Sequence, residues 1–285
     1  MLLIDNQIEL EKISAIISGQ KIVSIDTEFQ RTSSYYAKLS LIQMVCGEHQ
    51  IIIDVLAKLD LTPIRKLFSN SSILKVFHAP RQDFEILYNI FGFIPNNVFD
   101  TQIAAEVLGL GKSLSYSELC WQICGVKLDK KNQFSNWLKR PVDAEKLDYA
   151  INDVLYLAKI YEMLQDKIRQ NNLENLYEQK LSQLLSLNNY KFDSSIAWKK
   201  IRFQNSSTKL KKYMQEIAAF REEHARNLDV PRRHFLTDEE LIAICKSLPT
   251  NEQELKKLNI RSSHFKKNRL NIRLQEICLA LKEDI

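Results

Sequence analysis

The first half of the chain shows hydrophobic patterns that alternate between strand and helix. Residues 21–29 combine β-branched side chains with alternating apolar and polar positions, which is typical of a strand. Residues 39–46 and 49–54 have the same character and are separated by two residues, so the three segments predict a meander. The pattern then predicts a helix near 62–68, strands at 73–78 and 98–99, and helices at 82–91, through 109, at 117–124 and at 143–169. This order indicates an α/β domain with a mixed sheet.

The pattern changes after this domain. Residues 188–208 are polar and rich in Asn and Ser, which is typical of a linker. An all-helical pattern follows, in which Thr237 and Glu240 have the spacing of a capping box. Asn251 opens a further helix, and residues 269–282 carry apolar side chains at helical spacing. The predicted organisation is an α/β domain at 1–187, a linker at 188–208 and a small all-α helical bundle at 209–285.

Length and composition agree with two soluble domains. The chain has 285 residues, of which 45% are hydrophobic and 26% charged. No apolar run approaches the roughly 20 residues that span a bilayer, and Asp5 interrupts the start as no signal peptide would. We therefore expect a cytoplasmic protein with no membrane partner. The five cysteines form no C-x-x-C pair, so neither a zinc site nor a disulfide framework is expected.

The positive charge is concentrated near the C-terminus. The formal net charge is +5, and residues 201–285 carry 17 Lys and Arg against 12 Asp and Glu, while the acids and bases of the first 200 residues balance. A neutral body with a basic appendage is typical of a protein that recruits a polyanion through one module and acts with another. A solvated lysine-rich surface is the alternative, and charge alone does not separate the two.

Several acids recur at spacings that bring them together. Asp26 and Glu28 are i and i+2 on a predicted strand, so both project from one face, about 6.6 Å apart along it. Tyr149 and Asp153 are i and i+4 on a predicted helix and share a face, and Asp83 begins the helix after the fourth strand. Asp-x-Glu occurs four times in the chain, but only Asp26 and Glu28 lie on an apolar strand, where a pair of charges needs a reason. Carboxylate oxygens are the ligands that hard divalent cations take.

The sequence around these acids resembles the exonuclease motifs of the ribonuclease D family. The matching stretches are Asp26-Thr27-Glu28-Phe29, Lys75-Val76-Phe77-His78-Ala79 with Asp83, Phe99-Asp100-Thr101-Gln102, Trp137-Leu138 with Arg140-Pro141, and Tyr149-Ala150 with Asp153-Val154. Together they cover about residues 20–165. The resemblance implies a ribonuclease H-like fold, the DEDDy class of 3′→5′ exonucleases and two divalent metal ions, Mg²⁺ or Mn²⁺.

The resemblance also implies a role for each acid. Asp26 would bridge both ions and Asp83 would hold one of them. Glu28 and Asp153 would hold the ion on the nucleophile side, and Tyr149 would orient or deprotonate the attacking water. Two ions roughly 4 Å apart can activate a water, stabilise the phosphate charge and assist the leaving oxygen. Four acids packed without cations would repel one another and take up protons, and acids on a solvated face are the alternative interpretation.

Three further residues of the first domain are candidates for RNA contacts. They are His78, Trp137 and Arg140. For His78, a packed histidine or one that supports the metal ligands is at least as good an interpretation as a catalytic one. Trp137 fits the hydrophobic core as well as it fits RNA.

The C-terminal segment resembles the helicase-and-ribonuclease-D C-terminal (HRDC) domain over about 209–285. The residues that carry this resemblance are Phe220-Arg221-Glu222-Glu223, Ala225-Arg226, Leu228-Asp229-Val230-Pro231 and Phe235-Leu236 with Asp238 and Leu241. It implies a small helical bundle that binds nucleic acid or partners. Arg232, Arg233, Phe265, Lys266 and Lys267 combine bases that meet phosphates with an aromatic stacking face. A solvated basic surface with Phe265 in the core is the alternative. Many family members carry two such modules, and this chain has room for one.

The leading hypothesis from the sequence is an exoribonuclease that trims RNA 3′ ends and releases nucleoside 5′-monophosphates. Precursors of transfer RNA are the substrate that the family implies, and no protein partner is identifiable. A DNA exonuclease of the same architecture is an alternative, because neither metals nor motifs report the 2′-hydroxyl. A non-catalytic nucleic-acid-binding protein is a second alternative. The retention of all five motif residues argues against it.

Overall fold

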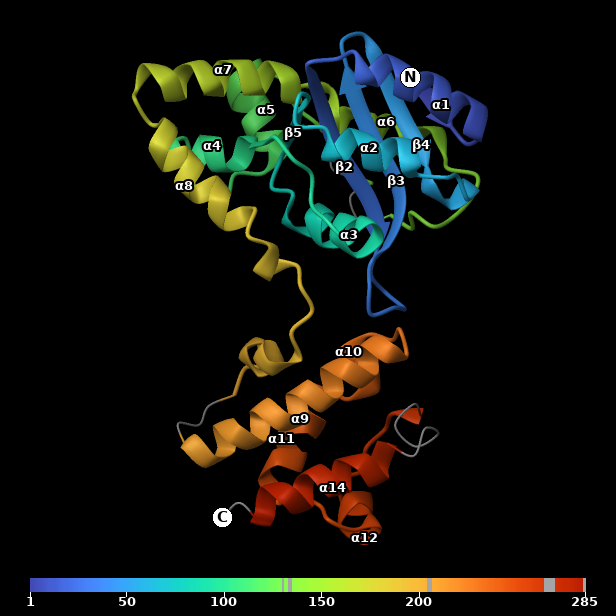
Figure 1. Ribbon diagram of the computed structural model, residues 1–285, viewed down its shortest axis with the longest axis vertical. Coiled ribbons are helices and arrows are strands. Elements are labelled where there is room, and N and C mark those ends of the chain that lie inside the picture. Colours follow the sequence, from blue (N-terminus) through green and yellow to red (C-terminus); the bar gives the residue numbers. More distant parts are fainter. Residues whose placement is uncertain (130, 133–134, 204–206, 264–269, 284–285) are drawn as a thin grey trace. The chain divides into compact units, whose positions relative to one another are not determined.

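The chain folds into two units, which Figure 1 shows in a computed structural model. Unit 1 comprises Met1–Gln30 and Lys38–Lys191, and unit 2 comprises Arg31–Ala37 and Phe192–Ile285. The structure describes all residues except 130, 133–134, 204–206, 264–269 and 284–285. The short segment 31–37 therefore belongs with the C-terminal residues, although it lies between two strands of unit 1 in the sequence. No helix in the described part of either unit is long and apolar enough to cross a membrane.

Unit 1 is built on a six-stranded mixed sheet with the order β1-β4-β3-β2-β5-β6. The strands are β1 (Leu2–Ile4), β2 (Ile22–Gln30), β3 (Lys38–Cys46), β4 (His49–Asp54), β5 (Leu74–Phe77) and β6 (Val98–Asp100). The predicted meander is confirmed, because β3 pairs antiparallel with both β2 and β4. Gly47 has a φ of +54° in the two-residue turn between β3 and β4, a conformation that glycine adopts without strain. The parallel pairs β2–β5 and β5–β6 follow from the helical crossovers, which confirms the mixed sheet.

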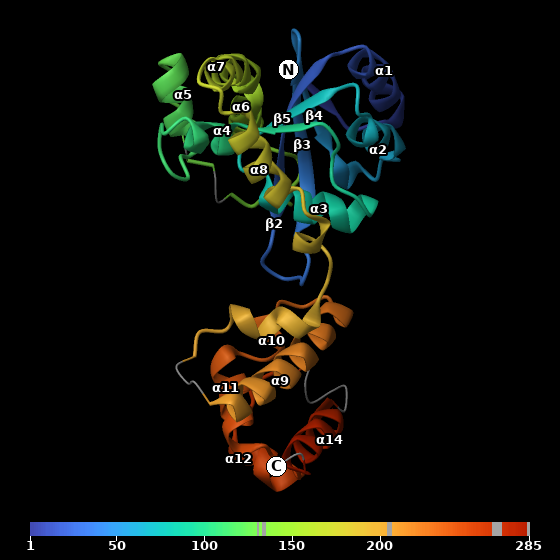
Figure 2. The same cartoon turned by 60° about the vertical axis from the view of Figure 1, so that its left-hand side comes forward.

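Helices cover the two faces of this sheet (Figure 2). On one face lie α1 (Gln7–Ser18) and α2 (Thr62–Ser69). A short 3₁₀ turn, η1 (Val55–Ala57), follows strand β4. The remaining helices of unit 1 are α3 (Arg81–Phe91), α4 (Thr101–Val107), α5 (Tyr116–Cys124), α6 (Ala144–Leu155), α7 (Leu157–Gln170) and α8 (Glu174–Leu184), followed by the 3₁₀ turn η2 (Leu187–Asn189). Helices α4 to α7 lie on the face opposite α1 and α2. The buried side chains of β2 and β3 therefore have packing partners on both sides.

The single helix predicted at 143–169 is wrong, because the structure breaks it into α6 and α7. Tyr156 lies at the break, with a φ of −101° and a ψ of −2°, and caps the end of α6 and the start of α7. Its backbone N–H donates 3.0 Å to the hydroxyl of Tyr116, a partner outside the helix. Helix α6 packs on β2, β3 and β4, whereas α7 packs mainly on α4 and α5. One straight helix cannot follow both surfaces, and the hydrophobic spacing alone did not reveal the change of direction.

Unit 2 is a helical bundle, as predicted. Its helices are α9 (Thr208–Asn227), α10 (Arg232–Phe235), α11 (Asp238–Ser247), α12 (Glu252–Lys257) and α14 (Leu270–Glu283). The capping box of Thr237 and Glu240 is confirmed at the start of α11, and the Asn251 side chain caps α12. The unit also contains residues that the sequence placed in the linker at 188–208. A 3₁₀ helix, η3 (Ser194–Lys200), follows Phe192, and Ala197 is buried in the core of the bundle beside α9.

Candidate active site

Strand β2 supplies the first two carboxylates of the site. It lies between β3 and β5 in the sheet: Ile22–Ser24 pair with β5, and the stretch that carries Asp26 and Glu28 pairs with β3. Asp26 pairs opposite Gln43, and Glu28 pairs opposite Leu41. The register shifts directly after Glu28, and such an irregularity changes the direction of the strand next to a site. Both acids are half-buried, although the strand around them is apolar.

Helix α6 supplies the next carboxylate and a tyrosine. Ala150, Ile151 and Val154 are buried on one side of α6 and anchor it in the core of unit 1. On the side toward the sheet, ligand oxygens of Asp153, Asp26 and Glu28 all lie within 4.8 Å of one another. The Tyr149 hydroxyl donates a hydrogen bond to Asp153, one helical turn away. The predicted convergence of β2 and this helix is therefore present in the structure.

The fourth acid, Asp83, lies in the first turn of α3 and is buried. Its carboxylate accepts a hydrogen bond from the hydroxyl of Thr27, which sits between Asp26 and Glu28 on β2. The charge of Asp83 is also the strongest of the neighbouring charges that raise the pKa of Asp26. The pKa of Asp26 is thus raised by the charges of all three other acids, Asp83, Asp153 and Glu28.

The electrostatics of the cluster are those of acids without counter-charges. Burial, followed by the charges of the neighbouring carboxylates, raises the pKa of Asp26 well above its ordinary value and that of Glu28 to about 9. Burial also raises the pKa of Asp83 and that of Asp153 to about 6 each. Every neighbouring charge that shifts Asp26 and Glu28, within the described part of the chain, is itself a carboxylate. Such a cluster is stable in its ionised form only when cations neutralise it.

The residues present fit a divalent metal ion. Three carboxylate oxygens within 4.8 Å of one another match the all-oxygen surroundings that Mg²⁺ and similar ions require. Gln43 gives a second indication, because its buried side-chain amide has no hydrogen-bond partner among the described residues. Its place opposite Asp26 puts it on the same face of the sheet. A buried amide of this kind is normally completed by water or a ligand.

A family model described as a 3′-5′ exonuclease matches residues 1–169, and a model of the HRDC domain matches residues 211–277. Curated ribonucleases D align along nearly the whole chain. The protein from Bartonella henselae is 36% identical over 94% of this chain and 66% of its own length, and that from Nitrobacter hamburgensis is 34% identical over 93% and 70%. The chain belongs to the ribonuclease D family. It spans about two thirds of the length of these curated relatives.

Solved structures agree with this assignment. Escherichia coli RNase D, described as an exoribonuclease involved in structured RNA processing, superimposes with a TM-score of 0.88 at 27% identity, over 99% of this chain and 76% of that chain. The catalytic core of RRP6 from Trypanosoma brucei matches with a TM-score of 0.73 at 24% identity, over 99% and 79%, and shares the fold. Brucella melitensis NrnC, solved with bound Mg²⁺, matches 66% of this chain and 92% of its own with a TM-score of 0.53 at 23% identity, which again shows the fold alone.

His78 is packed inside this ribonuclease D fold. Its Nε2 donates 3.0 Å to the carbonyl of Leu114, and its Nδ1 lies 2.9 Å from the hydroxyl of Thr101. Burial lowers the pKa of His78 to about 4, so the ring is neutral at physiological pH. Both ring nitrogens therefore have partners within the protein. An RNA contact of His78 stays a prediction, and the geometry favours the packed alternative.

Trp137 and Arg140 likewise support the domain from within. Trp137 is buried, its ring lies 6.1 Å from that of Tyr149, and its indole N–H has no partner among the described residues. Arg140 binds Asp54 through two hydrogen bonds of 2.6 and 2.7 Å and also donates to the Trp137 carbonyl at 2.7 Å. These contacts hold the segment that contains Trp137 in place, so that the Trp137 ring lies next to the ring of Tyr149. Contacts of either residue with RNA stay predictions.

The sequence analysis missed two supporting residues of the site. Asp100 is buried and accepts hydrogen bonds from the N–H groups of Ala79 at 3.0 Å and Gln102 at 2.8 Å. Ala79 has a φ of +52°, a strained conformation for a residue with a side chain, in the turn that leads to Asp83. The other missed residue is Thr27, which holds Asp83 directly. Asp100 lies within one of the family motifs, but neither residue carries a spacing signal that would reveal its partner.

The predicted RNA-binding residues of unit 2 lie in two places. Arg232 and Arg233 belong to α10, with partly exposed side chains. Phe265, Lys266 and Lys267 lie outside the described residues. For all five residues, RNA binding stays a prediction.

Proposed function

We propose that this ribonuclease D is a 3′→5′ exoribonuclease that hydrolyses the terminal phosphodiester with two divalent metal ions and releases nucleoside 5′-monophosphates. The observation that carries the proposal is the meeting of Asp26, Glu28 and Asp153, whose oxygens lie within 4.8 Å of one another. Asp83 supplies the fourth carboxylate from α3, bound to Thr27 of the same strand. These four acids with Tyr149 make up the set that the DEDDy motifs require.

The geometry suggests a division of roles within the set. Asp26 lies close enough to Asp83, Asp153 and Glu28 for the charges of all three to raise its pKa, so it is the residue that we expect to contact both ions. When bound, the ions supply an activated water and stabilise charge on the phosphate. Burial and the charge of Asp153 raise the pKa of Tyr149 above its ordinary value, so its hydroxyl is protonated at neutral pH. We therefore assign Tyr149 the role of orienting the attacking water by a hydrogen bond rather than removing its proton.

Precursors of transfer RNA are the proposed substrates. This part of the proposal rests on family membership and on the structured-RNA processing stated for the E. coli neighbour. The four acids and the tyrosine read no base, so selection of the RNA would come from its free 3′ end and from binding elsewhere on the protein. A DNA exonuclease of the same fold is the second candidate, because phosphate chemistry is common to both polymers.

The test is stepwise degradation of RNA from its 3′ end. A 5′-labelled RNA should give a ladder of shortened products in Mg²⁺ or Mn²⁺, chelator should stop the reaction, and added metal should restore it. A circular RNA of the same sequence should resist, and cleavage of the circle would show an endonuclease instead. A matched DNA oligomer separates the two candidates, because faster hydrolysis of DNA than of RNA would reverse the assignment.

A further inference from the structure

Unit 2 contains a pocket that is separate from the carboxylate cluster. It has a volume of about 470 Å³. Its lining residues are Arg31, Thr32, Ser34, Tyr35, Lys200, Arg221, Pro231, Arg232, Arg233, His234 and Asp238. Four parts of the unit contribute to it: the segment 31–37, η3, α9 and the stretch from Pro231 to the start of α11. We call it the basic pocket, because its lining has five Lys and Arg side chains and one carboxylate.

Two acids near the basic pocket have partners within the protein. Asp238 is partly buried and accepts a 2.6 Å hydrogen bond from Arg221, which is itself fully buried. Glu222 is also buried, and it accepts a 2.6 Å hydrogen bond from the hydroxyl of Tyr35. The exposed cations, in contrast, are only loosely paired. Lys200 lies 4.0 Å and Arg232 lies 3.7 Å from the same oxygen of Glu222.

The cations consequently present a surplus of positive charge to solvent. One buried carboxylate serves both Lys200 and Arg232, and each contact is longer than a good charge-assisted hydrogen bond. The side chains of Lys200 and Arg233 are 56% and 62% exposed, and Glu239, which lies 3.5 Å from Arg233, is exposed as well. Exposed ion pairs of this kind contribute little and are readily exchanged for another anion.

One wall of the basic pocket is held firmly in place. The Asp229 carboxylate accepts hydrogen bonds from the backbone N–H groups of Tyr35 at 3.1 Å and Tyr36 at 3.4 Å. Arg226 donates 2.5 Å to the Tyr36 hydroxyl, and its guanidinium lies 4.2 Å from the ring centre of Phe192. The segment 31–37 is thus fixed by α9 and the residues that follow it. A fixed wall lowers the entropy cost of binding a ligand.

We infer that the basic pocket binds a phosphate of the RNA backbone, as a second binding site of the enzyme on the strand that it shortens. The inference rests on the proposed function for the identity of the polyanion. Lysine and arginine side chains recognise phosphate, and the tyrosine of the lining is engaged within the protein, because the Tyr35 hydroxyl is bound to Glu222 and its ring packs on Tyr36 and Phe192. The exposed cations of the pocket therefore favour contacts with the backbone over contacts with the bases. Arg31 directly follows β2 in the sequence, so one continuous stretch of chain carries Asp26, Glu28 and a wall of the pocket.

The test compares two double variants that each remove two positive charges from unit 2. The pocket variant is Lys200→Gln with Arg233→Gln, whose side chains are exposed and whose loss leaves Glu222 bonded to Tyr35. The control is Lys256→Gln with Arg273→Gln, which are 73% and 66% exposed and pair with acids of their own helices outside the pocket. A 20-nucleotide RNA and the DNA of the same sequence are titrated onto each full-length protein in chelator, so that no cleavage occurs.

The pocket variant should bind RNA about 10-fold more weakly than the unchanged protein, and its slope of log affinity against log salt should fall by roughly 0.7 for each lost phosphate contact. The control should stay within about 2-fold, as expected for exposed pairs. DNA should lose the same factor as RNA, because the two share the phosphate. Lys200→Arg with Arg233→Lys should restore most of the affinity.

Three outcomes would overturn the inference: equal weakening in the control, unchanged RNA binding in the pocket variant, or a loss confined to RNA. The second of these would leave the pocket as a surface for a protein or another ligand. A separate cleavage assay on the unchanged protein keeps the two proposals apart. If RNA binds through the pocket but is not shortened in Mg²⁺, the proposed function fails and the pocket stands.

Discussion

The two units hold their buried charges in opposite ways. In unit 1, burial raises the pKa values of the four acids of the cluster, Asp26, Glu28, Asp83 and Asp153. The charges of neighbouring acids raise the pKa values of Asp26 and Glu28 further. In unit 2, Glu222 is buried and Asp238 is partly buried, and a tyrosine hydroxyl or an arginine meets each of them. The arginine of unit 2 neutralises Asp238, whereas the neighbouring charges that shift Asp26 and Glu28 of unit 1, among the described residues, are those of other acids.

This difference separates a structural use of charge from a functional one. A buried carboxylate that an arginine meets holds two elements together, as Asp238 and Arg221 do for α9 and α11. Carboxylates whose neighbouring charges are those of other carboxylates destabilise the metal-free fold, and bound cations offset this destabilisation.

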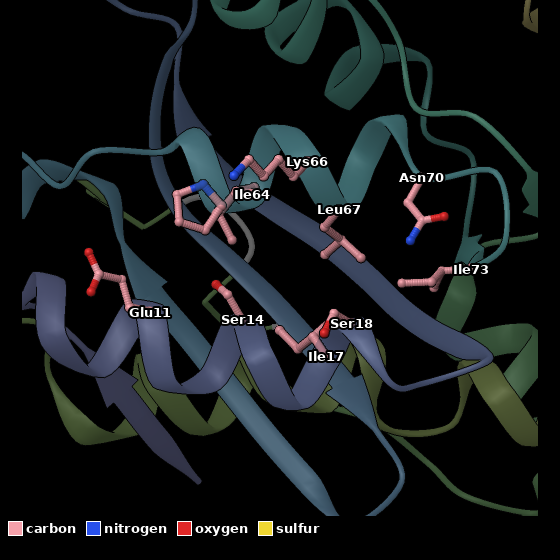
Figure 3. Close-up of a pocket in the computed structure, with 10 residues that line it drawn as sticks. Glu11, Ser14, Ile17, Ser18, Ile64, Lys66, Leu67, Asn70 and Ile73 are labelled. Atoms are coloured by element: carbon pink, nitrogen blue, oxygen red, sulfur yellow. The ribbon is translucent and has the colours of Figure 1, made fainter.

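The groove between α1 and α2, with a volume of about 250 Å³, contains neither an arginine-paired carboxylate nor a carboxylate cluster (Figure 3). Its floor is apolar, with Ile17 and Leu67, and none of the catalytic candidates lines it.

The largest expected effect comes from Asp26→Asn. Because Asp26 is proposed to touch both ions, hydrolysis of RNA should fall by about 10³-fold or more, equivalent to several kcal/mol of transition-state stabilisation. The same change should raise the melting temperature of the metal-free protein, since it removes one charge from a group of buried acids. Rates and melting curves in chelator check both. Near-normal activity would remove this site from consideration.

Tyr149→Phe should lower the rate by about 10²-fold, the range of a lost proton-positioning group. The fold should be intact, because the ring keeps its contact with Trp137 and only the hydrogen bond to Asp153 is lost. Single-turnover rates at saturating RNA measure the effect, with Tyr161→Phe on α7 as a control outside the cluster. An unchanged rate would show that the water is oriented by other groups.

Removal of residues 192–285 sharpens the comparison of the two units. Unit 1 has its own hydrophobic core, so it should fold and keep metal-dependent hydrolysis. KM should rise by about 10-fold, and RNA affinity should fall less steeply with salt, because phosphate contacts of unit 2 are lost. The cut belongs before Phe192 and not at 208, since a later cut would leave Ala197 and Ile201 without their core. Equal affinity and equal salt slopes for the short and complete chains would contradict a tethering role.

A smaller effect is expected from pH on the metal-free protein. The folded-state pKa values of Asp83 and Asp153, about 6, and of Glu28, about 9, exceed the ordinary values of 3.8 and 4.5. Acids whose pKa is raised in the folded state contribute their full stabilisation below pH 4, and this contribution is lost as pH rises through 6 toward 9. Mg²⁺ should offset the loss, so the gap in melting temperature between Mg²⁺ and chelator should widen by several degrees from pH 6 to 9. A constant gap would contradict the cluster as the metal site.

The smallest effect is expected from Thr27→Val. The change removes the hydroxyl that hydrogen bonds to Asp83 and that lowers its pKa, while the volume at this buried position stays similar. Activity near pH 6.5 should fall only a few-fold, and the deficit should shrink as pH rises and Asp83 ionises anyway. A pH–rate profile of kcat/KM measures this. A deficit that is the same at every pH would point to a displaced α3 instead.

Much of the fold follows from the sequence, because the signals are local. The alternation along β2, β3 and β4, the Gly47 turn and the capping box of α11 each depend on neighbours a few residues apart, and all are present as predicted. The same holds for the carboxylate pair on β2, whose common face is fixed by the pleat of a strand. Family motifs then connected these acids with Asp83, Tyr149 and Asp153.

Other features were decided only by contacts between residues far apart in the chain. The break at Tyr156 depends on Tyr116, and the seating of Asp83 depends on Thr27, 56 residues earlier. Residues 192–201 fall within the predicted linker because Asn, Asp and Ser punctuate the stretch 188–208, yet Ala197 and Ile201 pack in an apolar core with α9 and its neighbours.

The pairing of charges shows the same limit. The sequence placed acids and bases on their elements, but it did not show that Glu222 meets Tyr35, 187 residues away, or that Arg140 is bound by Asp54. Backbone periodicity acts over a few residues and is written in the sequence itself. Which buried polar group satisfies which other is settled only when packing brings distant segments within hydrogen-bond distance. The sequence by itself therefore determined the chemistry of the carboxylate set, and the tertiary structure decided which charges are neutralised within the protein and which ones we propose for the binding of metal and RNA.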